Sequence, residues 1–275
     1  MTVEIVGRVP ASAHPASRRA QSALLSHRGV RVAGGALVLG LLVWQLGTGP
    51  FIDGLRATSP WAILVALVVT AGTTWCCAAR WSLVSARFAG SGHSRVPLLT
   101  AYAAYYRSQL INATVPGGVV GDVHRAYRHG WRGVVWERGL GQLVQVALVG
   151  TVLLPGGWRW AGLAVLGVAA VVGGAVVVLS ALAVSGHLVI FLVAAESVGV
   201  ALTPLQLLTI GALVLLGAAI PLNVAGWGPR EGVAVWAFAA FGSTAAVGLA
   251  VSVTFGVLAT VATLPGLVVL GGRRG

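Results

Sequence analysis

The stretch Leu163-Ala-Val-Leu-Gly-Val-Ala-Ala-Val-Val-Gly-Gly-Ala-Val-Val-Val-Leu-Ser-Ala-Leu182 contains one polar side chain, that of Ser180, and no charge. About 20 consecutive apolar residues are enough for a helix to cross the core of a bilayer. A transmembrane β-strand would instead alternate apolar and polar residues. Because lipid offers no partner to peptide groups, and a helix pairs them internally, the stretch predicts a membrane helix.

The rest of the chain has the same apolar character. Of its 275 residues, 57% are hydrophobic and 9% are charged, and the mean hydropathy is +0.90. Similar apolar runs recur, and no hydrophilic block is long enough for a soluble catalytic domain. We therefore predict an all-α, polytopic helical membrane protein with eight or so apolar segments in a transmembrane domain at 32–272. Residues 1–31 are expected to form a disordered, arginine-rich cytoplasmic tail.

The charge of the chain is strongly positive, at +12, and all 18 basic residues are arginines. Nucleic-acid binding would gather them on one soluble face, whereas they lie between apolar runs, so no nucleic acid is expected. Their positions instead predict a multi-pass protein of the cell membrane with cytoplasmic termini, from the arginines in 1–31 and at 273–274. We interpret Arg80, Arg87 and Arg95 as markers of a cytoplasmic loop.

Two breaks interrupt the apolar pattern, and the first lies at 111–125. It reads Ile111-Asn-Ala-Thr-Val-Pro-Gly-Gly-Val-Val-Gly-Asp-Val-His-Arg125. The segment before it contains three tyrosines and is less apolar than a span, and arginines flank it on both sides. This pattern predicts a re-entrant hairpin at 97–125 that enters from the cytoplasm and returns to it. A full crossing, with the later arginines outside, is the competing topology.

The first break supports two interpretations of its charges. Asp122 and Arg125 would share one face of a helix, where each lowers the cost of burying the other. One interpretation is an ion-paired helix start, with Asp122 complementing the helix dipole. The other is a site for an anionic headgroup, in which Gly118 and Gly121 admit close backbone approach and Arg125 binds phosphate. The upstream tyrosines and Asn112 favour the second interpretation.

The second break, at 220–231, reads Ile220-Pro-Leu-Asn-Val-Ala-Gly-Trp-Gly-Pro-Arg-Glu231. It is typical of a discontinuous membrane helix whose broken ends face a site at depth. A charge at the bilayer centre costs roughly 2.5 to 3.5 kcal/mol, so Arg230 and Glu231 should face protein or water. The alternative is a surface loop that leads into the next helix. Both breaks pass through Asn and Val into glycines, which resembles the internal repeats of transporters, with chance as the competing explanation.

The candidate residues for a headgroup or cavity site lie in these breaks and beside them. Arg107 would be costly if it faced lipid, and the pair Glu137-Arg138 either belongs to the site or sets the topology of the next span. The full set is Arg107, Asn112, Pro116, Gly118, Gly121, Asp122, Arg125, Glu137, Arg138, Asn223, Gly226, Gly228, Arg230 and Glu231.

Catalytic and metal-binding motifs are not visible in the sequence. It has no nucleophile elbow, Walker loop, dinucleotide fingerprint or two-histidine zinc motif in a usable context. We interpret His124 and His129 as solvated loop residues, and the adjacent Cys76 and Cys77 as small packing residues. We therefore expect no enzyme activity, no cofactor and no metal.

The motifs together resemble the lysylphosphatidylglycerol synthase transmembrane family, whose members look like flippase-like integral membrane proteins. The resemblance covers the chain from about Val32 to Leu270, with one departure, Val120, where the family's Gly-Gly-Asp has its first glycine. The matching positions are Pro116, Gly118, Gly121, Asp122, Arg125, Glu137, Arg138, Gly226, Gly228, Arg230 and Glu231. The full synthases of this family look like such a membrane part joined to a cytosolic aminoacyl-transferase domain. The resemblance covers only the membrane part, so it implies a protein with the translocating half and without the synthetic half.

This resemblance leads to an expected function of lipid translocation. The cargo would be an anionic or modified phospholipid or a polyprenyl-linked carrier, with membrane lipids as partners. Arg125 and Arg230 would bind phosphate, and both breaks would meet in one wet pocket. The alternative is a non-catalytic membrane partner of a lipid-modifying or glycosyl-transferring enzyme. An enzyme acting within the bilayer is least consistent with the sequence, because no activated nucleophile is visible.

Overall fold

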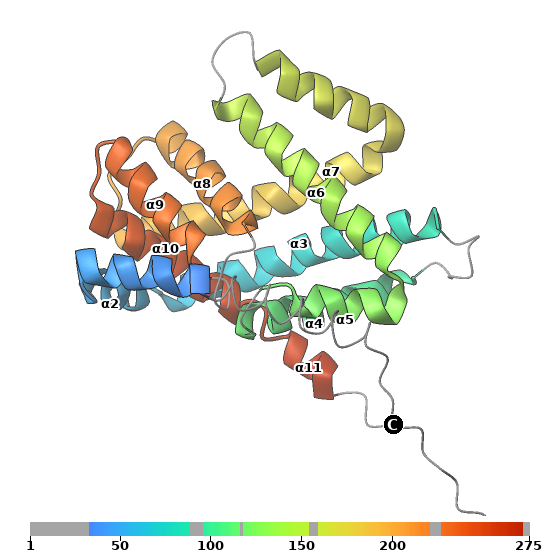
Figure 1. Ribbon diagram of the computed structural model, residues 1–275, viewed down its shortest axis with the longest axis horizontal. Helices are drawn as coiled ribbons and strands as arrows, with labels where there is room; N and C mark the ends of the chain where they lie inside the picture. The colour runs from blue at the N-terminus through green and yellow to red at the C-terminus, as the bar shows by residue number, and fades with distance from the viewer. Residues whose placement is uncertain (1–32, 89–95, 116–117, 154–158, 221–226, 272–275) are drawn as a thin grey trace, which may run out of the picture.

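The computed structural model describes residues 33–88, 96–115, 118–153, 159–220 and 227–271 (Figure 1). Within these ranges every element is a helix, which confirms the predicted all-α class. The elements are a helix at Ala33–Leu46, α2 (Gly49–Arg56), α3 (Pro60–Ala86), α4 (Leu98–Thr114), α5 (Val120–His129), α6 (Trp131–Leu153), α7 (Arg159–Val198), α8 (Pro204–Ala219), α9 (Pro229–Ala240), α10 (Ala245–Val261) and α11 (Gly266–Gly271).

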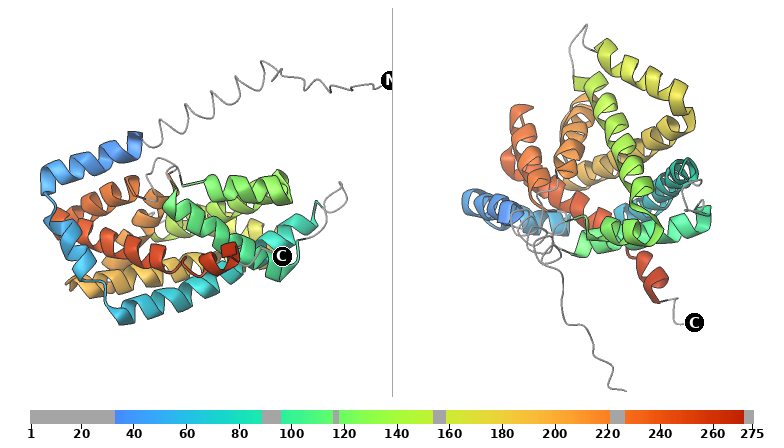
Figure 2. Two further views of the ribbon diagram at one scale, coloured as in Figure 1. Left: turned by 90° about the horizontal axis from the view of Figure 1, so that it is seen from below. Right: turned by 45° about the vertical axis from the view of Figure 1, so that its right-hand side comes forward.

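Three helical segments are long and apolar enough to cross a membrane: Pro60–Ala86, Gly173–Val198 and Ala245–Val269. A fourth is added if Ala33–Leu46 and α2, which meet at a bend of 100°, count as one broken span (Figure 2). The predicted number of eight or so apolar segments is not confirmed. The reason is that α8 has only 16 residues, and α6 carries charged side chains and glutamines along with its apolar ones.

These apolar helices also leave apolar side chains uncovered. On α3, Trp61, Leu64, Val68 and Trp75 recur at helical spacing, and each is more than 40% exposed. A soluble monomer rarely exposes an extended apolar face of this kind, because contact of the face with water is unfavourable. The exposed face and the length of the helices indicate a membrane protein.

The apolar stretch at 163–182 lies in α7, which bends in its middle. At Gly173 the φ and ψ angles are −169° and 61°, so the helical hydrogen-bond ladder is interrupted there. The half before the bend packs on α6, where Gly162 lies against Ala147 and Thr151 (Figure 1). The half after the bend packs on α3, where Gly186 lies against Thr73. One apolar run therefore packs on two different helices, α6 before the bend and α3 after it. The sequence pattern did not indicate this change of partner.

The two main buried cores share α3. Its first half contributes Ala62 and Ala66 to a core formed with α7, α8, α9 and α10. Its second half contributes Ala78 and Trp81 to a core formed with α4 and α6. The ends of the first break, at α4 and α5, therefore lie near the second core, while the second break leads into α9 in the first core (Figure 1).

The first core depends on three phenylalanines. The ring of Phe191 on α7 is fully buried, and its centroid lies 6.4 Å from that of Phe238 and 6.0 Å from that of Phe255. We expect Phe191→Ala to lower the free energy of unfolding by about 3 to 5 kcal/mol, because it removes dispersion contacts and leaves a cavity. Unfolding titrations in detergent would measure the change. Leu205→Ala, at a position 70% exposed, is the control, and equal midpoints for both variants would contradict the prediction.

Candidate functional site

The chain folds back on itself at the first break. Helix α4 ends at Thr114, Gly118 adopts a left-handed φ of 59°, and α5 begins at Val120. A Cβ atom at Gly121 would lie 2.1 Å from the carbonyl oxygen of Ser108, so only glycine lets α5 approach α4 this closely. The predicted break in the helix is confirmed, and it has the form of a helical hairpin. Its depth and its side of the membrane stay predictions, and Pro116 lies outside the described residues.

Five charged side chains from three helices form one network beside this hairpin. The carboxylate of Glu137 on α6 accepts hydrogen bonds from Arg80 Nε on α3 at 3.0 Å and from Arg125 Nη2 on α5 at 3.1 Å. The Arg125 Nη2 atom also donates to Asp122 Oδ1 at 3.1 Å, and Arg138 pairs with the other oxygen of Asp122. The sequence-predicted residues Asp122, Arg125, Glu137 and Arg138 are thus brought together, and Arg80 joins them.

Neutral side chains complete the hydrogen bonding of the two carboxylates. The hydroxyl of Tyr105 donates to Glu137 at 2.9 Å, and the hydroxyl of Ser108 donates to Asp122 at 3.1 Å. The side-chain amide of Asn112 donates to Asp122 at 2.9 Å and accepts from the backbone N–H of Gly121 at 2.7 Å. The predicted candidates Asn112 and Gly121 therefore hold the start of α5 in place beside the network.

Four of the five charged side chains are buried, Arg138 is half-exposed, and the charges do not cancel. Glu137 is fully buried, and Arg125, Arg80 and Asp122 are 2%, 6% and 9% exposed. Three arginines face two carboxylates, so one positive charge has no carboxylate to balance it. Burial raises the pKa of Asp122, but Arg138 and Arg125 outweigh it and hold that pKa below its ordinary value. The carboxylate of Asp122 is therefore ionised at neutral pH.

Arg125 occupies the centre of this arrangement. Its guanidinium carbon lies 4.1 Å from the centroid of the Tyr105 ring and 4.5 Å from that of Trp81. The negative faces of both rings attract the cation and fix the orientation of its plane. Its Nε and Nη1 atoms are buried and have no hydrogen-bond partner in the described part of the chain. The side chain is therefore held in place while two of its donor groups stay uncommitted.

Two cavities adjoin the network. The first, which we call the α5 cavity, has a volume of about 230 Å³, lies between α4, α5 and α11, and is lined by Arg125 of the network and by Ser108. The second, which we call the α8 cavity, has a volume of about 260 Å³ and is lined by Arg80, Tyr105 and Arg138 together with the end of α8. The two cavities share no lining residue, so different arginines of the network adjoin each of them.

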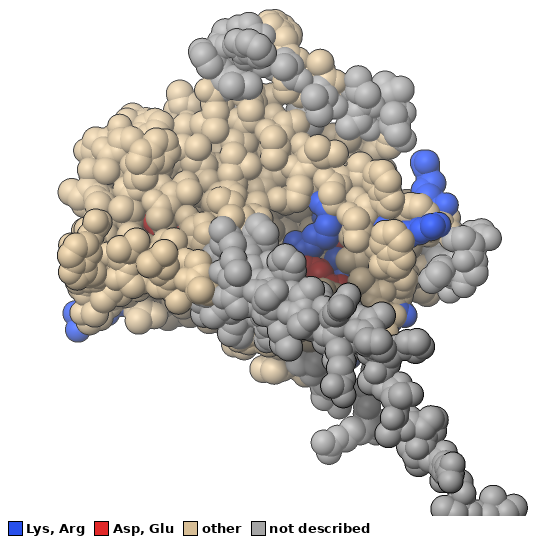
Figure 3. Space-filling view, in the orientation of Figure 1, with Lys and Arg blue, Asp and Glu red and all other residues tan. Residues whose placement is uncertain are grey.

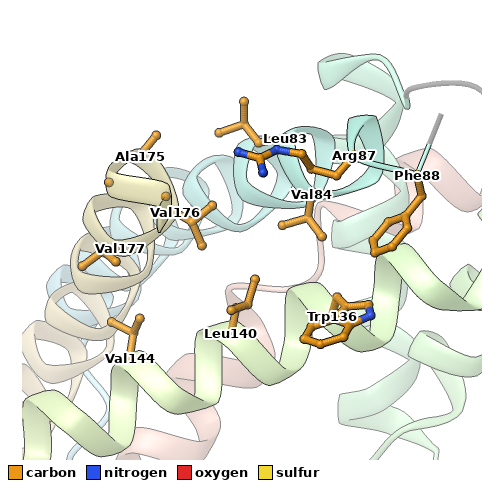
Figure 4. Close-up of a pocket in the computed structure, with 12 residues that line it drawn as sticks. Leu83, Val84, Arg87, Phe88, Trp136, Leu140, Val144, Ala175, Val176 and Val177 are labelled. Carbon is orange, nitrogen blue, oxygen red and sulfur yellow. The ribbon is translucent and has the colours of Figure 1, made fainter. Parts of the chain in front are cut away.

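Figure 3 shows how the charges are distributed over one face of the molecule. Basic side chains surround acidic ones in a recess over the half that holds α4, α5 and α6, while the other half of this face is almost uncharged (Figure 3). A third cavity, of about 390 Å³, lies between α3, α6 and the bend of α7. Its walls are mostly apolar, from Leu83, Trp136, Leu140 and Val176, with Arg87 at one edge (Figure 4).

The second break produces a separate and internally complete ion pair. Glu231 is fully buried and accepts from the backbone N–H of Gly228 at 2.6 Å, from Arg230 Nε at 2.8 Å and from the Ser252 hydroxyl at 3.2 Å. The Arg230 guanidinium lies over Trp227 and Phe255, at 5.2 and 5.4 Å from their ring centroids. These contacts are those of a capped helix start packed on α10.

The expectation of a single wet pocket shared by both breaks is not supported by the described residues. The hydrogen bonds and ion pairs of Arg230 and Glu231 involve the start of α9 and α10, and none reaches the network around Glu137. Asn223 and Gly226 lie outside the described residues. The second break nevertheless approaches the α8 cavity, because Ala218 and Ala219, at the end of α8, line it.

The structure also corrects two sequence interpretations. Arg80 is not a loop residue, because it lies inside α3 and its guanidinium donates to Ser180 at 2.9 Å as well as to Glu137. His124 and His129 are not solvated loop residues, because they lie on α5 and line the α5 cavity. Burial and the charges of two neighbouring arginines hold the pKa of His124 below its ordinary value. The sequence did contain a signal that Arg80 belongs to the site. Arg80 interrupts an otherwise apolar run, as does Arg107, which was selected as a candidate for that reason.

No protein-family model, curated protein or solved structure matches this chain. The resemblance to the lysylphosphatidylglycerol synthase transmembrane family therefore rests on the motifs quoted above. What the site can do follows from its own geometry.

The central carboxylate provides a test of the network. Glu137→Gln keeps the shape of the side chain but leaves two buried arginines without their shared counter-charge. We expect it to lower the free energy of unfolding by about 3 to 5 kcal/mol, as is typical when one partner of a buried ion pair is removed. Unfolding in detergent would measure this, with Glu196→Gln, at an exposed position on α7, as the matched control. A Glu137→Gln protein as stable as the control variant would show that the network is not stabilising.

Proposed function

We propose that this protein moves a lipid with an anionic headgroup between the two leaflets of a membrane. The observation that carries the proposal is the largely buried network around Glu137, which has one more arginine than carboxylates and lines two cavities in an apolar helical protein. An anionic or modified phospholipid and a polyprenyl-linked carrier both have such a headgroup. The motif resemblance to flippase-like proteins agrees with this function.

The energetic reason for such a network is the cost of moving charge through lipid. A headgroup in the hydrocarbon core loses its water, and an isolated charge there costs several kcal/mol. Guanidinium groups replace lost water by direct hydrogen bonds to phosphate oxygens. Arg125 and Arg138, which adjoin different cavities, would contact the headgroup in turn as it passes from one cavity to the other.

In this scheme, the carboxylates of Glu137 and Asp122 stabilise the protein when no headgroup is bound. Without a headgroup, Glu137 and Asp122 neutralise most of the arginine charge. A bound phosphate competes with Glu137 for Arg125, so that one anionic partner replaces another and the buried cation is never left unpaired. The motion required is therefore an exchange of partners within the network.

A translocation assay with matched arginine variants tests the function. Wild-type protein in vesicles that contain a fluorescent anionic phospholipid should expose the inner-leaflet label to a quencher added outside. We expect Arg125→Ala and Arg125→Lys to slow this at least about tenfold, because each loses the planar, multiply donating guanidinium that lies over Trp81 and Tyr105. Arg56→Ala, at an exposed position at the end of α2, is the control and should match wild type.

The outcomes separate translocation from a partner role. Each variant must first elute as a single species in detergent, so that misfolding is recognised. If wild type and both Arg125 variants translocate lipid at one rate, the network is not the pathway. If wild type moves no lipid but co-purifies with a lipid- or glycan-transferring enzyme, the non-catalytic partner role replaces the proposed function.

A further inference from the structure

The lining of the α5 cavity is rich in basic side chains. Its lining includes three arginines and two histidines, and no carboxylate from the described residues. These five side chains are Arg107 from α4 and His124, Arg125, Arg128 and His129 from α5. The lining also includes apolar side chains, Ala103 and Ala104 from α4 and Val269 from α11. The cavity therefore combines cationic and apolar lining.

Several of these side chains have uncommitted polar atoms. The Nε and Nη1 atoms of Arg125, the Nε of Arg107 and the Nε2 of His124 are buried and have no hydrogen-bond partner among the described residues. Arg125 is only 2% exposed, and its guanidinium lies over the faces of Trp81 and Tyr105. Buried polar atoms without partners destabilise a protein, and their concentration at one cavity indicates a ligand that supplies acceptors.

We propose that the α5 cavity binds the terminal phosphate of a lipid phosphomonoester. This inference rests on the proposed function, because it names the class of headgroup that the protein moves. A phosphomonoester carries between one and two negative charges at neutral pH and offers three terminal oxygens, whereas a phosphodiester carries one charge. Three guanidinium groups without a carboxylate among them match the more highly charged group.

The carboxylates paired with Arg125 do not cancel the charge of the cavity. Asp122 is also held by Arg138, Ser108 and Asn112. Asp122 and Glu137 both accept from the same nitrogen of Arg125, Nη2, which leaves its Nε and Nη1 without a partner among the described residues. Arg107 and Arg128 have no ion pair among those of the described residues. The cavity therefore keeps its positive charge while the network is intact, and its apolar lining fits the first part of an acyl or prenyl chain.

Binding of short-chain lipids to the purified full chain tests this site. The probes are dioctanoyl phosphatidic acid, which is a phosphomonoester, dioctanoyl phosphatidylglycerol, which is a phosphodiester with the same chains, and inorganic phosphate. By titration calorimetry in a neutral detergent, we expect phosphatidic acid to bind roughly tenfold more tightly than either other probe, because it alone combines the extra charge-assisted hydrogen bonds with apolar contact.

Two variants of cavity residues outside the ion-pair network test whether phosphatidic acid binds in the α5 cavity. Arg107→Gln and His124→Ala should each weaken the binding of phosphatidic acid, by roughly tenfold for the arginine. The first removes the charge and the guanidinium of Arg107, and the second removes the imidazole N–H as a donor to phosphate. Their effect on phosphatidylglycerol should be smaller. Arg56→Gln, far from the cavity in sequence and exposed at the end of α2, should bind all probes like wild type.

The results that would overturn the site are distinct from those that overturn the function. Equal affinity for both lipids, or unchanged binding by Arg107→Gln, would reject phosphomonoester recognition even if lipid translocation were observed. Equal affinity for inorganic phosphate and phosphatidic acid would assign the cavity to free phosphate and reject the lipid source. Selective binding of phosphatidic acid by a protein that moves no lipid would retain the site and reject translocation.

Discussion

The fully buried carboxylate of Glu137 is the constraint on which the site depends. It lies where α3, α4, α5 and α6 meet, and each of the other three helices supplies it with a donor: Arg80, Tyr105 and Arg125. An unpaired charge at this depth would be too costly to keep, so the three helices are held to the position at which all three donors reach it. The same requirement determines where α5 returns after the first break.

The two ion-pair sets of this protein differ in their charge balance and in the number of helices that they connect. Arg230 and Glu231 balance one another, lie in one turn of helix and are satisfied by a cap and by α10. The network around Glu137 has an excess cation, connects several helices and adjoins two cavities. A balanced pair has no charge left with which to attract a ligand, whereas an unbalanced network does.

Local features of the sequence predicted much of the fold and part of the site. Apolar runs gave the helical class, glycines gave the first break, and the spacing of Asp122 and Arg125 gave their pairing. The partners that complete the site could not be predicted in this way, since Arg80 is 57 residues from Glu137 and 100 residues from Ser180. The predicted number of apolar segments is not confirmed, because hydropathy does not distinguish a membrane-crossing helix from a short one such as α8, or reveal the bend at Gly173.

Different arginines of the network adjoin the two cavities, which bears on how the proposed passage of an anion would occur. Arg125 adjoins the α5 cavity and Arg138 adjoins the α8 cavity, and Asp122 is bonded to both arginines. Arg138 is the more exposed of the two, with its side chain 47% exposed, whereas that of Arg125 is 1% exposed and lies over the faces of Trp81 and Tyr105. In the proposed function, the Asp122–Arg138 pair would therefore be the first to separate. The side chain proposed to bind the headgroup first, Arg125, and the one proposed to move, Arg138, are thus different residues joined by the carboxylate of Asp122.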